Sequence, residues 1–128
     1  MYAPPGVRTS PDFPVPDTMK AWVLGNPGEL TLTEKQVPVP KRAEVLVRID
    51  AIAICATDLE VIAHGPPALI EGGLPFNKNF TPGHEYMGTV AALGPGVDEF
   101  AIGDRVTVEI HAGCGQCKRC RMGMYTSC

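Results

Sequence analysis

Residues 44–55 read EVLVRIDAIAIC and carry the clearest strand pattern of the chain. Apolar side chains occupy alternate positions, and a period of two places them on one face of an extended strand: Val45, Val47, Ile49, Ala51 and Ala53. Arg48 and Asp50 fall on the opposite face. The pattern predicts a strand that is buried on one side and that ends at a thiol, Cys55.

Four further segments have the composition of β-strands. Met19–Leu24 and Leu30–Val37 flank the turn sequence GNPG, which predicts a hairpin. Glu85–Leu93 and Asp104–Ile110 are separated by Gly-Pro-Gly and Gly-Asp turns. Short strands joined by glycine- and proline-rich turns are typical of a small β-barrel or β-sandwich. The sequence therefore predicts a mainly β fold.

Only one short helix is expected, and it follows Cys55. The sequence TDLE at 57–60 fits a capping box, in which Thr57 caps the helix and the carboxylate of Glu60 reaches back to the Thr57 N–H. The sequence HGPP at 64–67 ends the helix. We expect His64 to lie at this helix end and to face solvent.

Composition limits the class of protein. The chain has 128 residues, a formal net charge of −3 and 45% hydrophobic residues, which is typical of one globular domain. No apolar run reaches the roughly 18 residues of a membrane-spanning helix. Residues 1–17 hold 5 of the 13 prolines and no apolar core segment. We expect them to form a flexible arm, followed by a domain at 18–128.

Charge and cysteine usage limit the kinds of binding partner and the cellular compartment that the sequence suggests. The only basic cluster is Lys118, Arg119 and Arg121, and no aromatic platform accompanies it, which disfavours nucleic-acid binding. The chain has 5 cysteines, an odd number that does not suit a disulfide framework. The sequence indicates a cytoplasmic protein without a membrane or nucleic-acid partner.

Four of the cysteines lie close together near the end of the chain: Cys114, Cys117, Cys120 and Cys128. Four thiolates within so short a segment can converge on one ion and leave no open coordination position, which indicates a structural zinc site. An iron–sulfur site is the competing interpretation. The seven-residue gap before the last cysteine, with no proline after it, favours zinc.

A second set of possible metal ligands is spread along the chain. Cys55 ends the long strand, and Gly83-His84-Glu85 opens a later one. By residue type alone, such a cysteine and histidine are more often structural than metal-binding.

Four motifs occur together in order: AIAICATDL at 51–59, GHEYMGTV at 83–90, GDRV at 103–106 and the four-cysteine segment. In this order and spacing the chain resembles the N-terminal GroES-like catalytic half of the zinc-dependent medium-chain alcohol, polyol and threonine dehydrogenases. The resemblance runs from about Met19 to Cys128. It implies a partly open β-barrel with a four-cysteine zinc lobe, incomplete in this chain.

The resemblance also implies roles for individual residues. Cys55, His84 and Glu85 match the catalytic-zinc set, in which the carboxylate binds zinc in some members and lies behind it in others. Thr57 matches the hydroxyl that takes the proton of the substrate alcohol. Asp58 matches the acid that orients the histidine ligand. The four clustered cysteines match the structural-zinc lobe.

The activity so implied is oxidation of an alcohol or polyol by hydride transfer to NAD or NADP. The nicotinamide is bound in these enzymes by an α/β Rossmann domain, and no complete GxGxxG sequence occurs here. We therefore expect the chain to be part of a longer, homo-oligomeric enzyme and to be inactive alone. The segment Gly65–Phe80 is expected to border the substrate pocket.

Other classes remain open from the sequence. A non-catalytic interaction module would use zinc only in the four-cysteine lobe. A co-chaperonin is suggested by the barrel type alone. Many relatives carry a histidine three residues after the threonine, where this chain has Glu60. Glu60 is therefore either an alternative proton acceptor or substrate contact, or only the capping-box residue.

Overall fold

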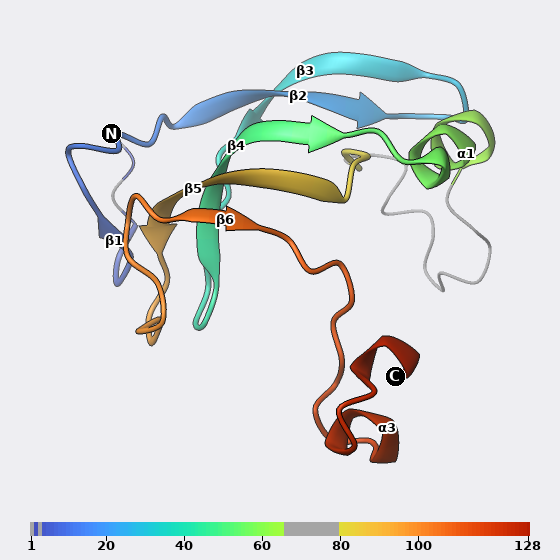
Figure 1. Ribbon diagram of the computed structural model, residues 1–128. Helices are drawn as coiled ribbons and strands as arrows, with labels where there is room; N and C mark the ends of the chain where they lie inside the picture. The colour runs from blue at the N-terminus through green and yellow to red at the C-terminus, as the bar shows by residue number, and fades with distance from the viewer. Residues whose placement is uncertain (1, 3, 66–79) are drawn as a thin grey trace.

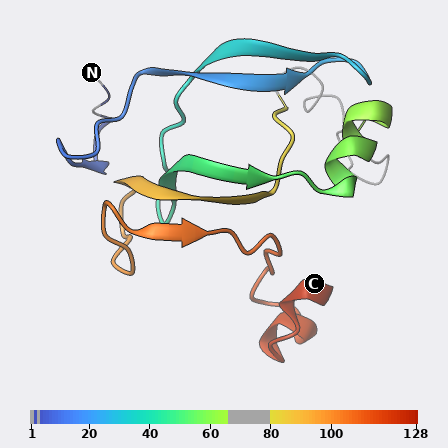
Figure 2. The same ribbon diagram turned by 45° about the horizontal axis from the view of Figure 1, so that its top comes forward.

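The computed structural model describes residues 2, 4–65 and 80–128, and it places them in two layers of β-structure with a separate lobe at the C-terminus (Figure 1). One layer is the hairpin of β2 (Thr18–Leu24) and β3 (Leu30–Gln36). The other is a four-stranded sheet of β1 (Arg8–Thr9), β4 (Val45–Ala53), β5 (Glu85–Leu93) and β6 (Arg105–Thr107). Turning the molecule shows the hairpin lying across the larger sheet (Figure 2).

The central strand of the larger sheet is β5. It pairs antiparallel with β4 along one edge, and with β1 and β6 along the other. The predicted strand at 85–93 is confirmed at both ends, and the predicted hairpin is confirmed, with Leu24 opposite Leu30. β6 is shorter than predicted, because pairing with β5 stops at Thr107.

The regular alternation predicted for β4 is interrupted. Register shifts occur between Leu46 and Val47 and between Ile49 and Ala51. Ile49 is opposite Gly88 and Ala51 is opposite the next residue, Met87, so the extra residue Asp50 moves the following side chains to the other face. The prediction of one continuous apolar face is therefore wrong beyond Ile49.

The buried core is small and lies beside β5. Val90, Leu93 and Val97 form its centre, and three partly buried side chains pack against them: Val45, Ile102 and Val106. A mainly apolar cavity of about 300 Å³ separates the hairpin from the larger sheet, with Met19 on one side and Ala91 on the other. No helix within the described residues is long and apolar enough to cross a bilayer.

Part of the N-terminal segment, whose prolines predict a flexible arm, forms a strand. Arg8 and Thr9 pair with Leu93 and Ala92 as strand β1, and the Arg8 guanidinium donates a hydrogen bond to the Val97 carbonyl. Pairing with a distant strand gives these backbone groups partners that a free arm would lack. Residues 8–9 therefore belong to the sheet of the domain.

Helical structure exceeds the single predicted helix. Helix α1 (Ala56–His64) follows β4 as expected, and His64 lies at its end with an exposed side chain. The C-terminal lobe adds α3 (Lys118–Arg121) and the 3₁₀ turn η1 (Tyr125–Ser127). Both turns lie within the segment that carries the four clustered cysteines.

Replacing Gly88 by Ala is expected to destabilise the protein by about 3 kcal/mol, because a methyl group there overpacks the sheet. The new Cβ would collide with the Arg48 carbonyl oxygen and lie 2.7 Å from Val47 Cγ1. Gly25→Ala is the control, since its Cβ would come only within 3.5 Å of Glu29 Oε2, and we expect a change below about 1 kcal/mol. Chemical denaturation measures both; equal losses would contradict the packing described here.

Candidate functional site

Cys55 stands at the junction of β4 and α1. Its backbone is extended, with φ −86° and ψ 154°, and it is the residue before the first helical turn. The Cys55 N–H donates a hydrogen bond to Asp58 Oδ2 at 3.0 Å, which satisfies a backbone donor at the helix start. The capping box is therefore formed by Cys55 and Asp58.

The predicted capping box of Thr57 and Glu60 is wrong in register. The helix starts two residues earlier than that pairing requires, so Glu60 lies inside α1. Its carboxylate is 3.6 Å from His64 Nε2, one turn further along, and both side chains are about three-quarters exposed. Cysteine is not among the usual helix-capping residues. In the sequence, only Asp58 therefore indicates the capping box that the structure forms at 55–58.

His84 faces Cys55 from the segment that leads into β5. Gly83 precedes it with φ +116°, a backbone conformation that residues with a side chain rarely adopt, so this turn favours glycine. His84 Nδ1 lies 3.1 Å from Asp58 Oδ1. Because an ionised carboxylate only accepts hydrogen bonds, this contact assigns a proton to Nδ1, and in the neutral ring Nε2 then carries the lone pair.

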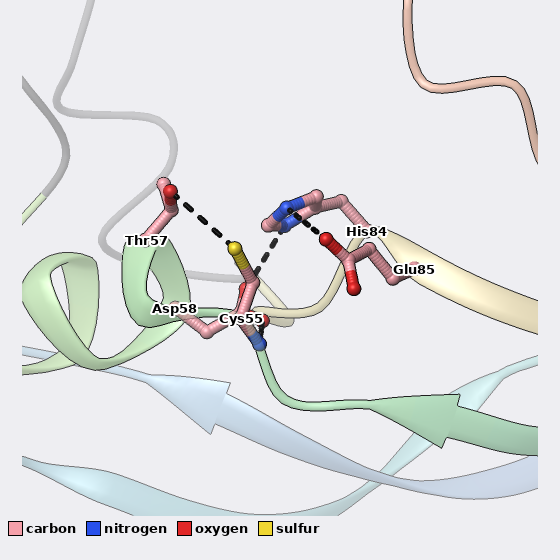
Figure 3. A network of polar contacts seen from close by, with 5 residues as sticks. All are labelled: Cys55, Thr57, Asp58, His84 and Glu85. Atoms are coloured by element: carbon pink, nitrogen blue, oxygen red, sulfur yellow. Dashed lines mark hydrogen bonds and ion pairs between the residues drawn. The ribbon is translucent and has the colours of Figure 1, made fainter.

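Asp58 thus contacts two elements with its two oxygens, and it is only 7% exposed. Figure 3 shows Asp58 beside Cys55 at the start of the helix, with Thr57 on the same helix and His84 and Glu85 on the strand side. The orienting role implied for Asp58 is consistent with this geometry. Its additional hydrogen bond to the Cys55 N–H is a contact that the sequence analysis missed.

Three possible metal ligands converge above this carboxylate. One ligand atom each of Cys55, His84 and Glu85 lie within 4.8 Å of one another. Glu85 Oε1 is 3.8 Å from His84 Nε2, and Thr57 Oγ1 is 3.7 Å from Cys55 Sγ. Cys55 and His84 are partly exposed and Glu85 is exposed. A thiol, an imidazole and a carboxylate form a three-donor set that fits an open zinc site.

The four cysteines of the lobe also converge. One sulfur from each of Cys114, Cys117, Cys120 and Cys128 lies within 4.8 Å of the others, and none forms a disulfide. The N–H of Cys117 donates to Cys114 Sγ at 3.3 Å, and that of Cys114 to Cys128 Sγ at 3.4 Å. The backbone therefore wraps around the sulfurs.

The electrostatics of the lobe are those of closely packed sulfurs. Backbone N–H groups of Cys117 and Gln116, followed by the neighbouring sulfurs, lower the pKa of Cys114 to about 6. At Cys128 the N–H of Cys114 also acts to lower the pKa, but the neighbouring sulfurs outweigh it and raise the pKa to about 11. Four thiolates in one place need a compensating cation, and a divalent ion fits this donor set.

The structure thus brings Cys55, Thr57, Asp58, His84 and Glu85 together at one site and the other four cysteines at a second. Glu60 has its described contact with His64, outside the ligand cluster. The segment expected to border the substrate pocket lies outside the described residues, apart from its two ends, Gly65 and Phe80.

Comparison with known proteins gives the family of this chain. The family profile of the alcohol dehydrogenase GroES-like domain matches residues 41–128. Sorbitol dehydrogenase of Bacillus subtilis is 40% identical over 114 residues, which cover 89% of this chain and 31% of that protein. L-Threonine 3-dehydrogenase of Pyrococcus horikoshii is 37% identical over 105 residues, which cover 76% and 27%.

Solved structures show the same fold. A thermostable alcohol dehydrogenase from Pyrobaculum aerophilum superposes with a TM-score of 0.76 at 32% identity, covering 87% of this chain and 32% of that one. A second structure of that enzyme is described as cobalt and zinc bound. Acetophenone reductase from Geotrichum candidum, in complex with NAD, gives a TM-score of 0.71 at 32% identity and covers 90% and 32%.

The fold and the two clusters define a GroES-like domain. The chain belongs to the alcohol dehydrogenase GroES-like domain family, and with it to the zinc-type medium-chain dehydrogenases that its motifs resemble. It spans about a third of the length of the curated relatives that it matches. The predicted mainly β, GroES-like fold is confirmed.

Replacing Asp58 by Asn is expected to destabilise the protein by about 1–3 kcal/mol, because an amide has one acceptor oxygen for two N–H donors. Denaturation should show the loss, and hydrogen exchange should accelerate for the amides of residues 56–64. Asp98→Asn is the matched control, since Asp98 is exposed in the turn after β5. A variant at Asp58 as stable as this control would contradict the bridging role.

Proposed function

We propose that this chain is the N-terminal catalytic part of a zinc-dependent oxidoreductase that oxidises an alcohol or polyol by hydride transfer to NAD or NADP. The observation that carries the proposal is the convergence of Cys55, His84 and Glu85 within 4.8 Å, with Asp58 holding the imidazole. The similarity to sorbitol and threonine dehydrogenases supports the substrate class. The cysteine usage supports a cytoplasmic location.

The catalytic metal would be held by Cys55 Sγ, His84 Nε2 and a carboxylate oxygen of Glu85. Three protein ligands are typical of catalytic zinc, because they leave a position for substrate. Zinc bound there supplies Lewis-acid chemistry, which lowers the pKa of a hydroxyl group that it contacts. The closed set of four cysteines in the lobe would hold a structural zinc.

The chain's own residues perform the remaining steps. Asp58 keeps the proton on His84 Nδ1, so that Nε2, 3.8 Å from Glu85 Oε1, is left to bind the metal. The exposed Thr57 hydroxyl, 3.7 Å from Cys55 Sγ, is placed to accept the proton of a substrate hydroxyl and pass it outward. The nicotinamide would be bound by a further domain of a homo-oligomeric enzyme.

We propose that Glu60 accepts the proton from Thr57. The two residues are three apart on α1 and therefore neighbour each other on the helix surface. The Glu60 carboxylate in turn contacts His64 at an exposed position. A proton leaving Thr57 would thus reach solvent along the surface of the helix.

Zinc content tests the assignment of both sites. The whole protein should contain two zinc ions per chain by elemental analysis, and Cys55→Ser and Cys128→Ser should each remove one while leaving the other. A single zinc that only Cys128→Ser removes would instead support a non-catalytic zinc-binding module. Iron with visible absorption would contradict both interpretations.

Activity of the whole enzyme tests the role of Thr57. Thr57→Ala should lower kcat/KM for alcohol oxidation by about a hundredfold or more, because it removes the proton-transfer group. Thr57→Ser should keep most of the activity, since it retains the hydroxyl. Thr31→Ala, at an exposed position of β3, is the control; equal activities of Thr57→Ala and this control would refute the relay.

The pH dependence of kcat tests the role of Glu60. Glu60→Gln keeps the size and helix propensity of the side chain but removes the carboxylate. We expect a changed pH–rate profile, with normal zinc content because Glu60 lies outside the ligand cluster. A profile identical to that of the wild type would exclude Glu60 from proton transfer.

A further inference from the structure

The five cysteines lie in two unlike environments. In the lobe, four sulfurs lie within 4.8 Å of one another, and Cys114 Sγ is 4.0 Å from Cys120 Sγ. Cys55 is surrounded by Thr57, His84 and Glu85, and among the described residues its cluster contains no second cysteine sulfur. Within this part of the chain, an oxidised sulfur in the lobe therefore has a neighbouring thiol to react with, whereas an oxidised Cys55 has none.

Access and geometry also favour reaction in the lobe. Cys114 and Cys128 are exposed, while Cys117, Cys120 and Cys55 are partly buried. A disulfide requires the sulfurs to approach to about 2 Å. From 4.0 Å this needs only a small movement of side chains on the short turns α3 and η1.

We propose that the lobe is an oxidation site for hydroperoxides, and that its metal is released when the four thiolates become two disulfides, while the Cys55 cluster keeps its metal. The inference rests on the zinc content proposed above for the lobe. It adds a modification chemistry that distinguishes the two metal sites.

The chemistry is balanced with the peroxide as oxidant. A cysteine thiolate attacks the O–O bond of a hydroperoxide, which gives a sulfenic acid and, after uptake of a proton, an alcohol or water. A neighbouring lobe thiol then attacks the sulfenic sulfur, which forms the S–S bond and expels water. Each disulfide consumes one peroxide, takes two electrons from the sulfurs and removes two thiolate ligands. Two disulfides leave no thiolate to bind zinc.

The test uses the whole protein loaded with zinc and treated with hydrogen peroxide. A chromogenic chelator should report the release of one zinc per chain. Peptide mass analysis should find four hydrogens lost from the segment 114–128, with Cys55 unmodified. A dithiol reductant with added Zn²⁺ should restore the original zinc content.

Two variants identify which of the two sites releases its zinc. The Cys55→Ser variant, which keeps only the lobe zinc, should release that ion on peroxide treatment as the wild type does. Cys128→Ser leaves three thiols in the lobe, so it should form only one disulfide there. The zinc count before treatment tests the proposed function separately from this inference.

Several results would overturn the inference. They are the retention of both zinc ions, the simultaneous loss of both, first oxidation at Cys55, or zinc release without disulfides in the lobe. A lobe that contains no zinc before treatment would overturn it as well.

Discussion

The site depends on one buried carboxylate. Asp58 accepts a hydrogen bond from the Cys55 N–H with one oxygen, at 3.0 Å, and from His84 Nδ1 with the other, at 3.1 Å. The first bond fixes the point at which α1 begins, and the second fixes the orientation of the imidazole. Hydrogen bonds to a charged group contribute about 1.5–3 kcal/mol each. Because the Asp58 side chain makes both hydrogen bonds, it fixes three segments relative to one another: the end of β4, the start of α1 and the segment before β5.

The sheet provides the frame on which this carboxylate acts. Ala53 is opposite Glu85 at the end of the β4–β5 ladder, so the residues that follow one strand and precede the other meet at one edge. The lobe, by contrast, lies at the end of an extended segment after β6 (Figure 1). The two clusters therefore differ in design. Three unlike donors are held by the sheet and helix, the kind of set that we propose for an open zinc site, whereas four like donors are held by their own short loop, the kind of set that we propose for a closed one.

Features set by local sequence were predictable, and those set by distant contacts were not. The strand at 85–93 and the hairpin follow from local composition and turns, and both are confirmed. The bulge at Asp50 depends on the partner strand, and the ordering of Arg8 depends on Leu93 and Val97, far along the chain. The members of both clusters were predicted from residue type and from the family resemblance, and the structure brings them together; that they bind metal stays a prediction. The capping register was missed because Cys55 is an unusual cap, and the shared role of Asp58 appears only when His84 is placed beside it.

The most direct measurement is the tautomer of the His84 ring, read from its ¹⁵N and ¹H chemical shifts in the zinc-loaded protein. We predict a proton on Nδ1, hydrogen-bonded to Asp58, and an unprotonated Nε2 with the shift of a metal ligand. A proton on Nε2 instead would contradict this arrangement, because the nitrogen that lies 3.8 Å from Glu85 Oε1 could not then bind a metal.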